Sequence, residues 1–143
     1  MEQTVTDSQT AARLRRAVTR LNRRLRASSL GGITPAQASL LALVDSLDNP
    51  SLGDLAAAEQ IQPPSVTRLI RAMEAQDLVV CVTDAEDRRC TRVRLTARGR
   101  REVTAIRQRK TAFLERRLQA LSAQERERAS EVASFLELLL EEE

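Results

Sequence analysis

The stretch DAEDRRCTRVRLTARGR, residues 84–100, decides how the rest of the chain is interpreted. Residues 90–96 alternate, so that Arg92 and Arg94 share one side of a strand while Val93 and Leu95 share the other. A β-branched run, LVVCV, precedes it at residues 78–82. The two runs predict a hairpin with a charged tip. Its charge has three interpretations: a solvated loop, an ion-pair network within the fold, or a surface that lies against phosphates.

Upstream of the hairpin, QPPSVTRLIRAMEAQD predicts a helix over residues 63–76, because proline is tolerated in the first helical turn but not in the interior. Its core-facing stripe, at the i, i+3, i+4, i+7 spacing, consists of Val66, Leu69, Ile70 and Met73. The opposite face consists of Pro64, Arg68, Arg71 and Ala75, with Thr67 on its flank. This face is small and basic near its N-terminal end, and it has the shape needed to enter a groove.

Further helices are predicted on both sides of this pair of elements. Apolar spacing and capping signals place them at residues 9–27, 35–47, 51–60 and 97–121, with a last helix after Ser122. Thr34 with Gln37, and Ser122 with Glu125, form capping boxes, and Thr96 is suited to cap the helix that follows the hairpin. The order predicts a mainly α fold with a small β-hairpin, a winged helix-turn-helix confined to residues 34–96.

The flanking segments, residues 9–33 and 97–143, carry apolar stripes longer than that module could cover. We therefore expect one domain over residues 1–143 whose outer helices bury these stripes in a homodimer. The arginines from Arg13 to Arg26 are then best interpreted as the solvated face of an interface helix rather than as DNA contacts.

Composition excludes several functions. The chain has no His, only two cysteines and only four glycines, so a histidine-based triad, a structural zinc site and a Gly-rich phosphate loop are excluded. We expect no enzyme and no cofactor. No apolar run is long enough for a membrane span, and the polar N-terminus lacks the apolar stretch of a signal peptide, which favours the cytoplasm. Cys81 and Cys90 are expected on adjacent strands as reduced residues without a redox role, although a wing disulfide is an alternative.

Two stretches, IQPPSVTRLIRAMEAQDLV and DAEDRRCTRVRLTARGR, resemble the MarR (multiple antibiotic resistance regulator) family of bacterial transcription regulators. The most specific pieces are D-x-x-D-R-R at the wing tip and L-T-x-x-G before the long helix. The resemblance covers nearly the whole chain in element order. It implies a dimer on a near-palindromic operator in double-stranded DNA, with helix 63–76 in the major groove and wing 83–92 in the minor groove.

The resemblance also implies residue roles. Arg89 takes the minor-groove contact, and Asp87 orients nearby basic side chains. Pro64, Ser65, Thr67 and Arg68 match the start of the recognition helix, and Thr96 with Gly99 match the helix-start motif. Asp77 departs from the pattern, because many relatives have Gly in the left-handed turn at this place.

The residue chemistry extends this interpretation. Arg68 is suited to a bidentate contact with guanine, while Ser65 and Thr67 suit bases or phosphates and Arg71 lies on the same face. Arg88, Arg92 and Arg94 are candidates for phosphate contacts, with solvent exposure an alternative for Arg94.

Two questions stay open at this stage. The family commonly releases DNA on binding small anions in a cleft; here the first, second and fifth helices would line it, with Arg23 or Arg26 facing the anion, but a protein without any effector is equally compatible. A helical protein–protein interaction module that meets an acidic partner is the alternative function, and repression is favoured over activation only by the resemblance.

Overall fold

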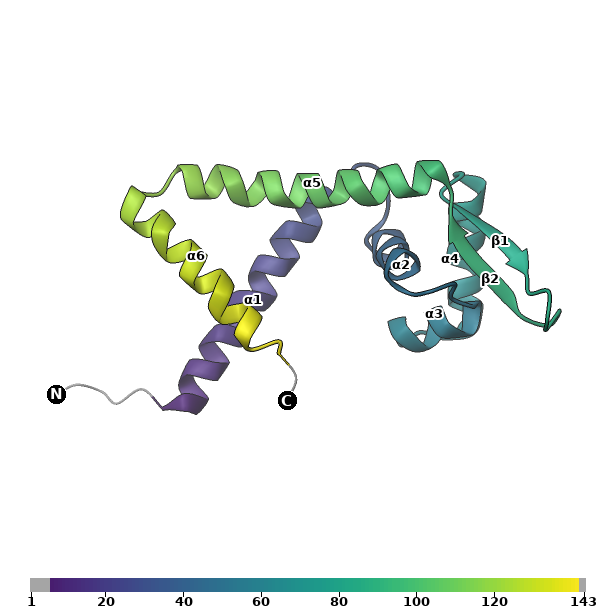
Figure 1. Ribbon diagram of the computed structural model, residues 1–143, viewed down its shortest axis with the longest axis horizontal. Helices are drawn as coiled ribbons and strands as arrows, with labels where there is room; N and C mark the ends of the chain where they lie inside the picture. Colours follow the sequence, from purple (N-terminus) through teal and green to yellow (C-terminus); the bar gives the residue numbers. More distant parts are fainter. Residues whose placement is uncertain (1–5, 142–143) are drawn as a thin grey trace.

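The computed structural model describes residues 6–141 and confirms a mainly α fold with one small hairpin (Figure 1). The elements, in chain order, are α1 (Asp7–Ser29), α2 (Pro35–Ser46), α3 (Leu52–Glu59), α4 (Pro63–Ala75), β1 (Val79–Thr83), β2 (Thr91–Leu95), α5 (Ala97–Gln119) and α6 (Ala123–Leu138). The long α5 joins two ends of the molecule. One end contains α2, α3, α4 and the hairpin, and the other contains α1 and α6.

Side-chain caps set most of the helix starts. Reciprocal bonds between Thr34 and Gln37 open α2, and the same arrangement between Ser122 and Glu125 opens α6, as the sequence predicts. A further box between Thr6 and Gln9 starts α1 at Asp7, before the expected position. The helix predicted at 51–60 is shorter at both ends, because Ser51 is its N-cap and Gln60 its C-cap. The helix predicted at 63–76 is shorter by one residue, because Gln76 is its C-cap.

The hydrophobic core lies at the end that contains α2, α3, α4 and the hairpin. Its fully buried side chains include Leu40, Leu41, Leu55, Val66, Ile70, Met73 and Val93. Val66, Ile70 and Met73 confirm the predicted stripe of α4, while Leu69 packs at its edge. Helix α2 is central, as expected, except that Leu47 at its C-cap is 37% exposed. From α5, Val103 and Ile106 close this core.

The two strands pair antiparallel, with Cys81 opposite Val93 and Val82 opposite Arg92. Val93 is buried and Arg94 exposed, which confirms the predicted alternation. The expected place of Cys90 is wrong: it precedes β2, at the end of the loop, because pairing stops at Thr83 and Thr91. Both cysteines are free thiols in this structure.

The turn after α4 and the start of α5 are tied together. Asp77 has φ +59°, which confirms the left-handed turn expected there. The Thr96 hydroxyl donates to the Asp77 carbonyl and accepts from the Gly99 N–H, so one side chain joins the turn to the first turn of α5. This junction fixes the hairpin relative to α4.

The end formed by α1 and α6 has little core of its own. Helix α6 buries none of its residues, and α1 buries only Ser29. Large apolar side chains there are exposed by 36% to 80%: Val18, Leu21, Leu118, Leu121, Val132, Phe135, Leu138, Leu139 and Leu140. Across residues 6–141, no helix combines the length and apolar character needed to cross a bilayer.

Candidate nucleic-acid interface

The outer face of α4 is exposed and basic. Pro63 and Pro64 occupy its first turn, which contains no acidic residue. Arg68 and Arg71 are exposed on the side opposite the core stripe. Within the described residues, no carboxylate lies within 4.0 Å of either guanidinium. Both cations are therefore available to an external anion.

Two smaller residues of α4 are less open than the arginines. Ser65 and Thr67 are half-buried, and the Thr67 hydroxyl donates to the Pro63 carbonyl at 3.1 Å. That bond uses the only hydroxyl proton of Thr67, so in this rotamer its oxygen faces a ligand as an acceptor alone.

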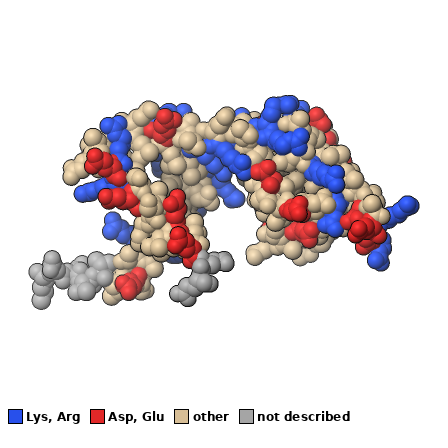
Figure 2. All heavy atoms as spheres, in the orientation of Figure 1, with Lys and Arg blue, Asp and Glu red and all other residues tan. Residues whose placement is uncertain are grey.

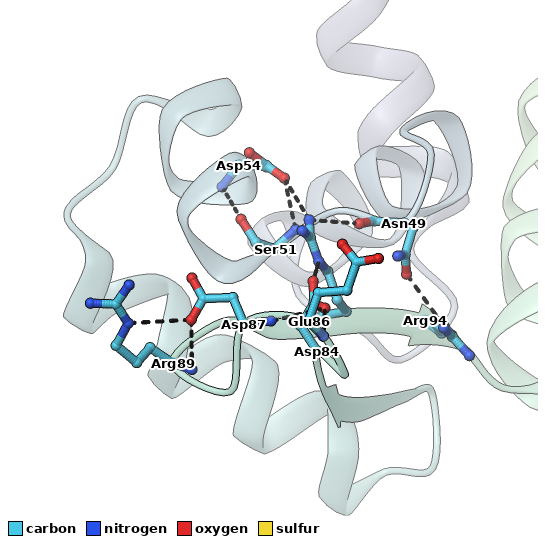
Figure 3. Close-up of polar contacts among 9 residues, drawn as sticks. Asn49, Ser51, Asp54, Asp84, Glu86, Asp87, Arg89 and Arg94 are labelled. Atoms are coloured by element: carbon cyan, nitrogen blue, oxygen red, sulfur yellow. Dashed lines mark hydrogen bonds and ion pairs between the residues drawn. The ribbon is translucent and has the colours of Figure 1, made fainter.

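The wing tip holds one arginine in a defined position. The Asp87 carboxylate accepts from the Arg89 backbone N–H at 3.1 Å and from the Arg89 Nε at 3.2 Å. The Arg89 side chain is nevertheless 93% exposed. Figure 3 shows this guanidinium extended away from the wing with Asp87 beside it. The acid and arginine that the sequence pairs are thus in contact, and the cation projects into solvent.

Arg88 is exposed beside Arg89, and the described residues place no carboxylate within ion-pair distance of it. In Figure 2, basic side chains extend from the wing end of the molecule next to a group of acidic ones. The tip therefore combines outward-facing cations with the carboxylates of Asp84 and Asp87, which accept hydrogen bonds within the loop.

Arg92, by contrast, is engaged inside the protein. Its Nε donates to the Asp84 carboxylate at 2.9 Å, and one terminal nitrogen donates to the Asn49 carbonyl at 3.2 Å. The same nitrogen lies 3.6 Å from the Asp54 carboxylate. These ties favour an intramolecular role over the phosphate contact expected from the sequence. The sequence includes Asp84 in the D-x-x-D-R-R motif but does not predict its contact with Arg92, and no sequence pattern brings Asn49 or Asp54 to this site.

The ionised carboxylates around Arg92 are stabilised by hydrogen bonds. The pKa of Asp84 lies below its usual value, chiefly because the Glu86 N–H donates to it and also because Arg92 does. The pKa of Asp54 is lowered chiefly by bonds from the backbone and hydroxyl of Ser51 at the start of α3. Both groups are therefore anionic at neutral pH.

A separate pocket of about 160 Å³ lies between the C-terminal end of α1, α2 and α5. Its lining includes apolar residues such as Leu30, Val103 and Ile106, together with the cations Arg26, Arg107 and Lys110. The position agrees with the cleft expected from the first, second and fifth helices. Arg23 instead lines a neighbouring groove with Arg26. Lys110 and Arg107 line the pocket from α5. The spacing of residues along the predicted helix does not indicate this role for either residue.

The arrangement of α3, α4 and the hairpin, with an exposed basic helix face beside an exposed arginine at the wing tip, defines a winged helix-turn-helix protein. The sequence profile of the MarR family matches residues 33–91. Mb0904, an uncharacterized HTH-type transcriptional regulator of Mycobacterium bovis, is 30% identical over 139 residues, which cover 95% of this chain and 96% of the relative. The chain belongs to the MarR family of DNA-binding transcription regulators, which are not enzymes.

Other comparisons agree with this assignment. YdgJ, an uncharacterized HTH-type transcriptional regulator of Bacillus subtilis, is 34% identical over 95 residues, or 66% of this chain and 58% of that relative. The crystal structure of a transcriptional-regulator candidate from Pseudomonas aeruginosa PA01 is 31% identical with a TM-score of 0.81, covering 99% of this chain and 100% of that one. A mutant of Staphylococcus aureus MepR, solved bound to an oligodeoxyribonucleotide, shares the fold at 22% identity with a TM-score of 0.70, covering 92% of this chain and 98% of that one.

Proposed function

We propose that the chain acts as a homodimer that binds a near-palindromic operator in double-stranded DNA and represses transcription in the cytoplasm. Helix α4 enters the major groove and the wing enters the flanking minor groove. One observation supports this most strongly: one oxygen of the Asp87 carboxylate accepts from both the backbone N–H and the Nε of Arg89, while the Arg89 side chain stays 93% exposed. Fixing a cation before binding reduces the entropy lost on contact.

On this proposal the residues of α4 contact different parts of the DNA. Arg68 reads guanine by a bidentate contact, Ser65 contacts a base or a phosphate, and Pro64 lies against the DNA backbone. Thr67, whose hydroxyl proton is used by the Pro63 carbonyl, accepts a hydrogen bond from a base amino group. Arg71, further along the same face, contacts a phosphate. At the wing, Arg89 enters a narrow A·T-rich minor groove, where negative potential is concentrated, and Arg88 meets the adjacent phosphates.

The exposed apolar side chains of α1, α6 and the end of α5 support the dimer. A homodimer would cover a patch that a monomeric protein rarely leaves open to water. Charge supports the same partner, since α1 carries seven arginines between positions 13 and 26, whereas α6 is net acidic, with four glutamates at 125, 127, 131 and 137 against two arginines at 126 and 128. We therefore assign dimerisation to residues 9–33 and 97–143, and DNA binding to residues 34–96.

The pocket between α1, α2 and α5 supports release by a small-molecule effector. Apolar walls with Arg26 and Lys110 at the lining suit a compact apolar molecule with one carboxylate. The pocket is lined both by the proposed dimer helices and by α2 of the DNA-binding end. A ligand bound there would therefore change the distance between the α4 helices of the two protomers. Salicylate at increasing concentration should weaken operator binding by the parent more than by Lys110→Gln.

The DNA-binding proposal is tested with a duplex that carries an inverted repeat, chosen by selection from genomic fragments. A regulator should prefer it over random duplex by roughly a thousandfold or more and should lose affinity steeply as salt rises. An interaction module for an acidic protein partner would instead bind every duplex equally and weakly. Equal affinity for both duplexes would therefore reject sequence-specific regulation.

A further inference from the structure

The wing base contains a hydrogen-bonded chain of residues that the proposed DNA contacts do not use. It begins where β2 meets the segment between α2 and α3. The Val93 N–H donates to the Pro50 carbonyl at 2.9 Å, and Arg92 forms an isolated bridge with Ser51. The start of the wing's return strand is thus attached to the helix-turn-helix rather than only to its partner strand.

Arg92 extends this attachment through its guanidinium. It contacts Asp84 at 2.9 Å, the Asn49 carbonyl at 3.2 Å and Asp54 at 3.6 Å, and its side chain is only 29% exposed. One guanidinium between two carboxylates leaves this cluster with a formal charge of −1. A phosphate would be repelled by the cluster as a whole, so Arg92 is poorly suited to hold the DNA backbone.

Asp84 links Arg92 to the backbone of the wing loop. One carboxylate oxygen receives Arg92, while the other accepts from the backbone N–H of Glu86 at 2.9 Å and of Asp87 at 3.4 Å. The loop closes through bonds from Asp84 N–H to the Cys90 carbonyl and from Cys90 N–H to the Asp87 carbonyl, both 2.9 Å. The Asp84 side chain is 18% exposed. Its carboxylate therefore organises the turn that precedes Asp87.

Asp87 completes the chain, because its carboxylate holds the backbone and the Nε of Arg89. We propose that Arg92 and Asp84 are positioning residues that set the place of Arg89 relative to α4 by tying the wing loop to the start of α3, without touching DNA themselves. This inference rests on the proposed wing contact. It assigns a role to the acidic residues of the wing, which would otherwise weaken an interface with phosphates.

The test compares Arg92→Lys and Arg92→Gln with the parent on the selected inverted repeat over a range of salt concentrations. Lysine keeps the charge but cannot bond to Asp84 and Asn49 in the geometry of the guanidinium fork. Both variants should weaken binding by about three- to tenfold, the cost of immobilising a side chain that is no longer pre-ordered. The slope of log affinity against log salt should stay as in the parent.

Arg88→Gln is the matched control, since it removes an exposed arginine of the same loop that is proposed to meet a phosphate. Its slope should fall by about 0.9 for each phosphate that the variant no longer neutralises. If Arg92→Gln lowers the slope in the same way, or if Arg92→Lys binds as well as the parent while Arg92→Gln binds more weakly, Arg92 is a phosphate ligand and the proposal is overturned. Unchanged binding by both Arg92 variants overturns it as well.

Asp84→Asn provides an independent arm that leaves the Arg92 contacts to Asn49 and Asp54 in place. It should reproduce the weaker binding, and the double variant Asp84→Asn/Arg92→Gln should be no weaker than the weaker single variant, because both changes break one chain. If the loss of affinity in the double variant equals the product of the two single losses, the proposal is contradicted. Helical content by circular dichroism must match the parent, and if Arg92→Gln fails this check, Asp84→Asn and Arg92→Lys decide.

The wing contact itself is checked by Arg89→Ala. If that variant binds as the parent does, the proposed wing contact fails. If Arg89→Ala weakens binding while the Arg92 and Asp84 variants do not, the wing contact stands and only the positioning role fails.

Discussion

Gly99 should be the least replaceable glycine of the helices, because α5 begins against the backbone of the turn after α4. A methyl group at Gly99 would overlap the Leu78 carbonyl oxygen and come within 3.0 Å of the carbonyl carbon. That carbonyl also accepts from the Thr96 N–H at 3.1 Å. The obstruction is the Leu78 backbone, which cannot rotate away as a side chain can, so relief requires a shift of α5 relative to the hairpin.

We expect Gly99→Ala to lower the free energy of unfolding by about 2 kcal/mol or more. Overpacking in a closed site costs about 1–3 kcal/mol and occasionally more, and the helix preference of alanine offsets less than about 1 kcal/mol. For a chain of this length, each kcal/mol shifts Tm by about 3 °C, so the melting temperature should fall by at least about 6 °C.

Gly53→Ala is the matched control. It also lies in a first helical turn, but its nearest neighbour is the Ser51 Oγ at 3.6 Å. This variant should be neutral or more stable by about 0.5 kcal/mol. Thermal melts at equal protein concentration compare the two. If Gly99→Ala melts with the parent, the close packing of α5 on the turn is wrong.

Three further predictions concern the turn, the wing base and the dimer. Asp77→Gly should raise the free energy of unfolding by up to about 1 kcal/mol in urea titrations, since φ +59° favours glycine; a decrease would show that the Asp77 side chain stabilises the turn. Asp84 and Asp54 have lowered pKa values in the fold, so the stability that they contribute is full above their unfolded pKa, near 4, and is lost as pH falls through their folded pKa. The free energy of unfolding of Asp84→Asn should therefore depend less on pH in the acid range than that of the parent. An identical pH dependence would refute the assignment. Phe135→Glu, at a side chain 50% exposed on α6, should shift the mass in light scattering from dimer toward monomer, whereas an unchanged mass would place the interface elsewhere.

The sequence was sufficient for the elements whose signals are local. Capping residues and helical spacing located α2 and the core stripe of α4, because a cap or an apolar stripe is set by residues within one or two turns. The strand alternation around Val93 and the left-handed turn at Asp77 were equally local.

The features that the sequence could not predict depend on distant segments that meet in the fold. Arg92 looked like its neighbour Arg94, and only the approach of Asn49 and Asp54 from the other side of the helix-turn-helix shows that its guanidinium is occupied. Lys110 carried no pattern that marked it, since the pocket wall forms only when α5 packs across α1 and α2. The alternation of residues 90–96 predicts a strand position for Cys90, but the pairing of the two strands ends at Thr83 and Thr91, and residue type does not set that limit.

The affinity of Arg89→Ala for the selected inverted repeat tests the central claim most directly. We predict at least a tenfold weaker affinity than that of the parent, of the size of about 1–3 kcal/mol for each arginine removed from a groove, with dimer mass and helical content unchanged. Binding equal to the parent would contradict the claim, because the exposed wing arginine that Asp87 holds would then lie outside the DNA interface.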